Sequence, residues 1–190
     1  MLTVALLAAL TLPLDPAQGG QDDPYDQSKV PLEVEPADPS NAKIVLVAGS
    51  KSHGPGDHEY FAGLALLMKM LQQTPGVAPI MVRDGWPKNE KIFENARAIV
   101  SFADGGKGHP ILKAGRMDVL QKEIDKGAGF VALHYAVNFP KESSERVLSW
   151  LGGYIEGGYS TSLATKWTAD FKSLPDHPVT RGLKPFQLHD

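Results

Sequence analysis

The sequence has no cysteine, no long apolar run and no excess of basic residues. The absence of cysteine from 190 residues excludes disulfides, thiolate metal sites and a cysteine nucleophile. A formal net charge of -3 at pH 7 gives none of the basic surface that binding to nucleic acid requires. The apolar run from Met1 to Leu14 is shorter than the roughly 20 residues of a membrane span. We therefore expect neither a nucleic-acid partner nor a membrane span in the mature protein.

The N-terminal apolar run is typical of a secretory signal peptide, although no Lys or Arg precedes it. Small residues follow it at Ala17 and Gly19, so we assign residues 1–19 as the signal peptide and expect a periplasmic or secreted protein. Residues 20–41 are rich in Pro, Asp and Gly and predict a flexible linker. The folded domain is expected at 42–190. Its end, QLHD, has no closing element, so we interpret the domain as truncated at its C-terminus.

Three continuous apolar runs, at residues 43–48, 98–102 and 129–134, are typical of strands buried on both faces of a sheet. A fourth strand is predicted at 77–82. Between them, helical spacing predicts one helix from 58 to about 73, capped by Asp57, and another from 112 to 126, ended by Gly127. Alternating strands and helices indicate right-handed βαβ units. The predicted fold class is α/β, with an open, mostly parallel sheet and helices on both faces.

Polar residues follow each of the three strong strands, where ligands of parallel sheets usually bind. These residues are Gly49, Lys51, Ser52 and His53 after the first strand, Asp104, Gly105 and His109 after the second, and His134 and Tyr135 after the third. The first loop is not a phosphate-binding P-loop, because Pro55 stands where that motif needs lysine. It is either a plain turn that leads into the helix or a loop whose Lys51 and His53 bind hydroxyls or an anion.

His134 is the strongest catalytic candidate, because a buried strand delivers its imidazole to the edge of the sheet, where it can transfer a proton. The alternative is a hydrogen-bonded histidine of the core. Asp104 could act as an acid or base or bind a sugar hydroxyl; the alternative is a simple turn with the following glycine. His109 and His177 precede proline and are interpreted as surface turn residues.

No cofactor is predicted, but a divalent metal is compatible with some of these residues. His53, His134, His189 and Asp190 would form a histidine–carboxylate set that can bind zinc, manganese or iron, provided that they share one edge. His53 and His58 are not a helical pair of ligands, since a Gly-Pro turn separates them. Four aromatic residues could stack on sugar rings or simply pack in the core: Trp86, Trp150, Tyr154 and Tyr159.

Together these segments resemble the ThuA-like (trehalose utilisation) family. The resemblance is carried by KIVLVAGSKSHGPGDHEY at 43–60, GWP at 85–87, residues 99–105, GAGFVALHY at 127–135 and HPVTRGLKPFQLHD at 177–190. It covers most of residues 43–190, and the first and fourth segments are the most specific. It implies a class I glutamine amidotransferase-like (flavodoxin-like) fold without amidotransferase chemistry, because His134 and Tyr135 stand where those enzymes carry their cysteine.

The resemblance also implies action on a disaccharide or a 3-keto sugar derivative, as a hydrolase, lyase or isomerase. His134, His53 and Asp104 would be catalytic. The substrate-binding candidates are Gly49, Lys51, Ser52, Gly105, Tyr135, His189 and Asp190. The alternatives are a non-catalytic carbohydrate-binding module of a larger exported protein and a purely structural domain. A homo-oligomer is left open.

The signal-peptide assignment predicts that the mature protein begins between Gln18 and Asp22. N-terminal sequencing of the protein secreted by its native host checks this expectation. Recovery of a chain with an intact Met1 from the cytoplasmic fraction would contradict it.

Overall fold

The computed structural model describes residues 26–161 and 165–189; the predicted signal peptide and Asp190 lie outside the described residues. The chain forms, in order, β1 (Ala42–Ala48), α1 (Tyr60–Leu71), β2 (Val77–Val82), η1 (Glu90–Phe93), β3 (Ala98–Phe102), η2 (Gly106–Gly108), η3 (Pro110–Leu112), α2 (Arg116–Asp125), β4 (Gly129–Leu133), η4 (His134–Val137), η5 (Lys141–Ser143), α3 (Ser144–Leu151), β5 (Thr168–Phe171), η6 (Pro178–Thr180) and β6 (Phe186–His189). None of the helices in the described ranges has the length and apolar character needed to cross a bilayer.

The main sheet contains four parallel strands in the order β2-β1-β3-β4. β1 pairs with a strand on each side: Val45 lies beside Ile80 of β2 and beside Ile99 of β3. The three strands with continuous apolar runs, β1, β3 and β4, are therefore neighbours, with β1 and β3 at the centre. β4 is the outer strand on its side of the described sheet.

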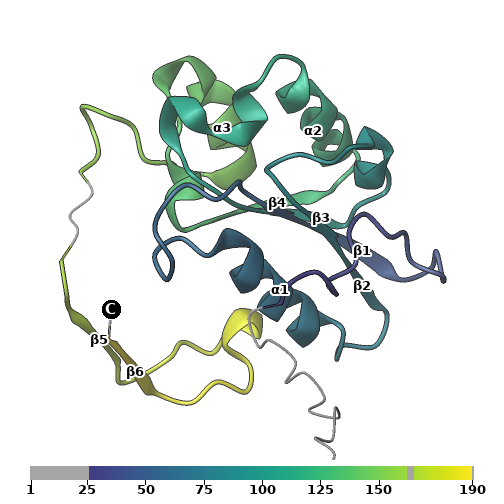
Figure 1. Ribbon diagram of the computed structural model, residues 1–190. Helices are drawn as coiled ribbons and strands as arrows, with labels where there is room; N and C mark the ends of the chain where they lie inside the picture. The colour runs from purple at the N-terminus through teal and green to yellow at the C-terminus, as the bar shows by residue number, and fades with distance from the viewer. Residues whose placement is uncertain (1–25, 162–164, 190) are drawn as a thin grey trace, which may run out of the picture.

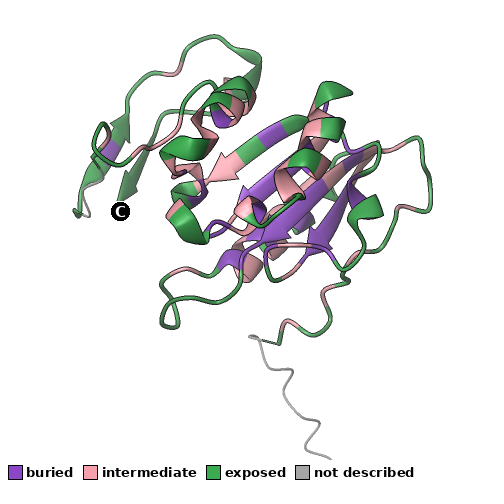
Figure 2. Cartoon of the chain, turned by 90° about the horizontal axis from the view of Figure 1, so that it is seen from above, coloured by how far each residue is buried: buried purple, intermediate pink, exposed green. Residues whose placement is uncertain are grey.

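Helices cover both faces of this sheet, with α1 on one face and α2 and α3 on the other (Figure 1). Leu46 points into the cluster that contains Leu64 of α1, whereas its neighbour Val45 packs in the opposite cluster with Leu120 of α2. Successive strand residues are thus buried on alternate faces, so the strands are apolar throughout and not at every second position. Figure 2 shows these buried strands between the more exposed helices. The α/β fold class is confirmed.

β4 departs from the expectation of burial on both faces. Phe130 is buried in the cluster with α2 and α3, but the side chain of Val131 on the opposite face is 40% exposed. α1 packs mainly against β1 and β2, so it leaves this part of β4 uncovered. The continuous apolar run could not reveal this difference, because it depends on how far a distant helix extends.

The helix boundaries also differ from the expected ones. α1 begins at Tyr60, and its N-cap Glu59 makes no side-chain capping bond. The expected cap, Asp57, instead belongs to a preceding turn in which its N–H donates to the Gly54 carbonyl at 3.2 Å. At the other predicted helix, Gly127 ends α2 with a φ of 101°, as expected.

Part of the segment predicted as a flexible linker packs onto the domain. Leu32 forms a parallel bridge with Met81 of β2, and the Glu33 N–H donates to the Met81 carbonyl at 2.8 Å. The Lys43 ammonium lies 3.0 Å from the Glu35 carboxylate. These contacts extend the hydrogen-bonded layer beyond β2, so residues 32–35 belong structurally to the domain.

β5 and β6 form a separate antiparallel pair, with Thr168 opposite His189. Both ribbon views place this pair away from the four-stranded sheet (Figures 1 and 2). His189 therefore lies on a different sheet from the three strands whose loops carry the other candidate residues.

Gly105 marks a close contact between the loops that follow β3 and β4. A Cβ atom added to Gly105 would lie 2.7 Å from the Asn138 Cβ and 2.9 Å from the Asn138 carbonyl oxygen. A Cβ added to Gly108 in the same loop would meet nothing within 4 Å. The absence of a side chain at Gly105 is thus a packing requirement.

Gly105→Ala should therefore lower the free energy of unfolding by about 1–3 kcal/mol, because the added methyl group must push the two loops apart. Gly108→Ala is the matched control, since both changes restrict the unfolded chain equally. Urea unfolding of the two variants measures the difference. Equal stabilities of the two variants would contradict the close packing.

Candidate functional site

The candidate residues gather where the chain leaves the sheet in two directions. The connection after β1 leads to α1 on one face, whereas the connection after β3 leads to α2 on the other face. β1 and β3 are neighbours, so their departing loops separate and leave a crevice at their carboxyl ends. Ligands of open α/β sheets characteristically bind at such a switch point.

The loop after β1 brings His53 and His58 together. A turn stabilised by the bond from the Asp57 N–H to the Gly54 carbonyl reverses the chain between them. Their ring centroids are consequently only 3.8 Å apart. The sequence spacing, which is not that of a helical ligand pair, gave no indication of this proximity, because the turn and not a helix produces it.

Asp104, two residues after the end of β3, lies beside these two histidines. Its Oδ1 atom lies 3.8 Å from the Nδ1 atom of His53 and 3.6 Å from that of His58. The Tyr60 hydroxyl donates a hydrogen bond to the same carboxylate oxygen at 2.5 Å and lies 2.9 Å from the Nδ1 atom of His58. The Ser52 hydroxyl lies 2.7 Å from the Nδ1 atom of His53. We refer to His53, His58 and Asp104 as the histidine–aspartate cluster.

The environment shifts the pKa values of Asp104 and Tyr60 in opposite directions. Burial acts to raise the pKa of Asp104, but hydrogen bonds from Ser52 and Tyr60 and the two nearby histidines act against it, and the pKa of Asp104 is lowered overall. Burial and the bond to Asp104 raise the pKa of Tyr60 to about 12. The carboxylate is therefore ionised and the phenol protonated around neutral pH.

His134 follows β4 and lies beside this cluster. Its ring centroid is 5.1 Å from that of His58, in an edge-on arrangement. The residue is exposed and has a φ of 55°, which is unusual for a residue other than glycine. The exposed position contradicts the alternative of a core histidine. The left-handed backbone turns the chain sharply at the end of the strand, where the imidazole is accessible to a ligand.

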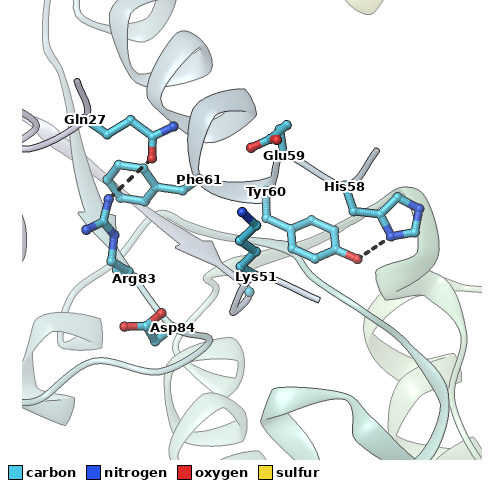
Figure 3. A pocket seen from close by; sticks show the side chains of 9 residues that line it. Gln27, Lys51, His58, Glu59, Tyr60, Phe61, Arg83 and Asp84 are labelled. Atoms are coloured by element: carbon cyan, nitrogen blue, oxygen red, sulfur yellow. Dashed lines mark hydrogen bonds between the residues drawn. The ribbon is translucent and has the colours of Figure 1, made fainter. Parts of the chain in front are cut away.

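A cavity of about 340 Å³ lies next to the cluster. Among the residues that line it are Lys51, His58, Glu59, Arg83 and Asp84. Figure 3 shows His58 and Tyr60 on one side of Lys51, with Arg83 and Asp84 on the other. The cavity thus presents cationic donors and carboxylate acceptors side by side.

The other substrate-binding candidates have varied positions. Gly49 lines the cavity and is buried: a Cβ atom there would lie 2.7 Å from the Ala103 Cβ. Gly105 packs against the loop after β4, and Tyr135 is 38% exposed on η4. His189 lies on β6, where its Nδ1 atom is 2.9 Å from the Thr168 hydroxyl. The structure does not bring His189 into the histidine–aspartate cluster.

His109 differs most from its prediction as a surface turn residue. It is 1% exposed, stacks on Phe139 with ring centroids 4.4 Å apart, and its Nε2 atom lies 3.1 Å from the Ala136 carbonyl oxygen. Burial lowers the pKa of His109 to about 4, so its ring is neutral and Nε2–H donates. The residue therefore anchors the helical turn η4, which carries His134. His177 is exposed, as expected.

The aromatic residues proposed as sugar platforms are mostly packed. Trp86 lies against Phe93, Trp150 lies edge-on to Phe130, and Tyr154 packs against the same core cluster. Tyr159 is the exception, with 82% of its surface exposed. Three of the four candidates are thus partly buried against the core and do not stand free as stacking surfaces.

Sequence reasoning missed two residues of the site, His58 and Tyr60, and the cavity residue Arg83. The signal for the first two was the unusually long segment between β1 and α1, which is polar until Tyr60. Tyr60 is the first residue of the apolar helix α1. It is indeed buried, at 2% exposure, but its hydroxyl reaches the Asp104 carboxylate.

The fold and the site define an α/β protein with a histidine–carboxylate cluster at the switch point of a parallel sheet. No family model matches the chain, and no curated protein matches it either. Among solved structures, a protein from Bacteroides uniformis described as ThuA-like superposes with a TM-score of 0.55 at 17% sequence identity. The match covers 82% of this chain and 61% of that chain, so this chain spans about three fifths of the length of that protein. The resemblance predicted from the sequence is thus confirmed at the level of the fold.

The raised pKa of Tyr60 predicts a specific pH dependence. In the unfolded chain this phenol ionises near its ordinary pKa of 10, whereas in the folded protein it stays protonated up to about 12. The stability that it contributes is therefore present below pH 10 and is lost as the pH rises through 12. Between these values the ultraviolet absorbance of tyrosinate should be the same in folded wild-type protein and in Tyr60→Phe.

Denaturing both proteins at that pH provides the control, because the wild type should then show one more ionised tyrosine than Tyr60→Phe. A lower tyrosinate signal for the folded variant than for the folded wild type would mean that Tyr60 ionises normally.

Proposed function

We propose that this chain is an enzyme that uses acid–base chemistry on a sugar or an oxidised sugar derivative bound at the switch point. The observation that carries the proposal is the convergence of an exposed imidazole, His134, with the histidine–aspartate cluster beside a polar cavity. Residues from three separate loops meet there, and a purely structural domain gives no reason for such a meeting.

The lining of the cavity supports a polyhydroxylated ligand. Each sugar hydroxyl both donates and accepts hydrogen bonds, so a sugar site needs donors and acceptors in close alternation. Lys51 and Arg83 supply donors, and Glu59 and Asp84 supply acceptors. The Arg83 guanidinium is fixed in place by stacking over the Phe61 ring, 3.7 Å from its centroid. A guanidinium whose N–H donors are held in fixed directions binds a ligand more selectively than a mobile guanidinium.

In the proposed reaction His134 transfers the proton, because its imidazole is exposed beside the histidine–aspartate cluster and imidazole is the commonest general acid or base. Asp104 accepts a hydrogen bond from a substrate hydroxyl and holds it near His134. Lys51 and Arg83 bind hydroxyl oxygens further along the substrate. This assignment covers hydrolysis, elimination or isomerisation at a sugar, each of which requires a proton to be moved at an oxygen or at a carbon beside a carbonyl group.

Disaccharides and their 3-keto derivatives are the proposed substrate class. The ThuA-like description of the structural neighbour and the family resemblance of residues 43–60 and 127–135 support this choice. The predicted signal peptide would place the reaction in the periplasm or outside the cell. If further elements of a longer protein belong to the site, this chain carries only part of the activity.

His134→Asn should lower the turnover of such a sugar by roughly 10²–10⁴-fold, the range that a general acid or base contributes. Asparagine tolerates the left-handed backbone, so stability should change little. Turnover of trehalose, related disaccharides and their 3-keto forms, followed by nuclear magnetic resonance, measures the effect. His177→Asn, a change at an exposed histidine elsewhere, is the control.

Full turnover by His134→Asn would end the assignment of His134. Binding of a sugar from this panel without conversion would instead support the non-catalytic carbohydrate-binding module. If no sugar is bound or converted, the substrate class is wrong.

A further inference from the structure

We propose that His53, His58 and Asp104 bind one divalent first-row metal ion, with zinc as the preferred ion, through one ring nitrogen of each histidine and one carboxylate oxygen. This ligand set differs from the one that the sequence suggested, which combined His53 with His134, His189 and Asp190. The proposal rests on the geometry of the cluster. The role of the ion in catalysis rests in addition on the proposed function.

The spacing of the donor atoms is close to that of a coordination sphere. One potential ligand atom from each of the three residues lies within 4.8 Å of the others. Ligand atoms bound to zinc at about 2.0–2.2 Å in tetrahedral geometry lie about 3.3–3.6 Å apart. The distances from Asp104 Oδ1 to the Nδ1 atoms of the two histidines, 3.8 and 3.6 Å, are therefore near this range. Binding of an ion would draw the three ligand atoms closer together through rotation of the two imidazole rings.

The histidines approach Asp104 without forming hydrogen bonds to it. Both nitrogen–oxygen distances exceed 3.5 Å, so neither imidazole is held by donation to the carboxylate. The Tyr60 hydroxyl has one proton, which it donates to Asp104, and it cannot donate at the same time to the Nδ1 atom of His58. The two imidazole nitrogens and the carboxylate oxygen thus face one another without a direct hydrogen bond between them, an arrangement that a shared cation would bridge.

The chemistry of the donors selects the class of ion. Two imidazoles and one carboxylate are a combination that favours zinc and other first-row divalent ions over magnesium or calcium, which prefer oxygen ligands alone. The side chains of His53, His58 and Asp104 are 45%, 25% and 32% exposed. Three protein ligands at such an accessible position leave coordination sites for water or a substrate oxygen, as in catalytic zinc sites.

His134 and Tyr60 lie next to the proposed ion but outside its ligand set. The ring of His134 contacts that of His58 and remains free to transfer a proton to or from a ligand oxygen on the ion. The Tyr60 hydroxyl orients Asp104 and competes with the ion for the same carboxylate oxygen. Removal of either side chain should therefore leave the ion bound.

Titration of the metal-stripped full chain with Co²⁺, followed by visible absorption, tests the site, because cobalt replaces zinc and reports its coordination. We expect one ion per chain, displaced by an equivalent of Zn²⁺. His53→Ala, His58→Ala and Asp104→Asn should each weaken binding by roughly 100-fold or more, beyond the 10–100-fold typical of residues outside the ligand set. Tyr60→Phe should weaken binding by no more than about 10–100-fold, because Tyr60 only orients a ligand, whereas His134→Asn and the distant control His177→Ala should retain the ion within about tenfold.

Thermal melting of each metal-free variant shows whether it folds. If a variant of one of the three ligand residues does not fold, histidine modification of the wild type by diethyl pyrocarbonate replaces it as the test. Bound Co²⁺ should protect His53 and His58 from modification and leave His177 reactive. Failure of the wild type to bind stoichiometric Co²⁺, or undiminished binding by folded Asp104→Asn or His58→Ala, would overturn the proposal. Cobalt binding without sugar turnover would count against the proposed function alone, and sugar turnover by a chain that binds no Co²⁺ would count against the metal site alone.

Discussion

The hydrogen bond between the Tyr60 hydroxyl and the Asp104 carboxylate connects the two halves of the site. Tyr60 is the first residue of α1, on one face of the sheet, and Asp104 begins the connection that leads to the other face. Together with the hydrogen bond from Ser52 to the same carboxylate, it joins the two departing loops across the switch point. Burial of the Tyr60 ring beside Phe102, with centroids 5.0 Å apart, fixes the position of the hydroxyl, so the bond can orient the carboxylate toward His53 and His58.

Close packing at two glycines holds the loops that carry this hydrogen bond. Gly49 passes over Ala103, and Gly105 lies against the residue that follows η4, Asn138; a side chain on either glycine would separate the loops. The buried ring of His109 adds a bond to Ala136 from the same direction. The exposed imidazole of His134 therefore stands on backbone that is closely packed underneath. This combination of a rigid base and accessible side chains is what positions chemistry in a functional site.

Much of the fold could be predicted from the sequence, because the runs at 43–48, 98–102 and 129–134 are apolar at every position. Only a sheet covered on both faces buries such runs, and parallel strands then send His53, Asp104 and His134 to a common edge. The exposed face of Val131 could not be predicted, because it depends on the reach of α1. His58 was missed because a reverse turn, and not helical periodicity, brings it to His53. Burial of His109 depends on Phe139, thirty residues away in sequence, whereas its local His-Pro pattern correctly predicts only a turn.

The histidines of this site have two proposed roles, metal coordination and proton transfer, and the position of His134 suits only the second. A residue held at a φ of 55° by a strand on one side and a helical turn on the other cannot shift its backbone toward the cluster without disturbing β4. His53 and His58, in contrast, belong to a loop whose turn can adjust by small movements as an ion draws its ligands together. Coordination benefits from that freedom, whereas proton transfer needs a fixed donor close to the bound oxygen. The same physical difference between a strand end and a glycine-rich loop therefore supports the proposed division, in which His53 and His58 bind the ion and His134 transfers the proton.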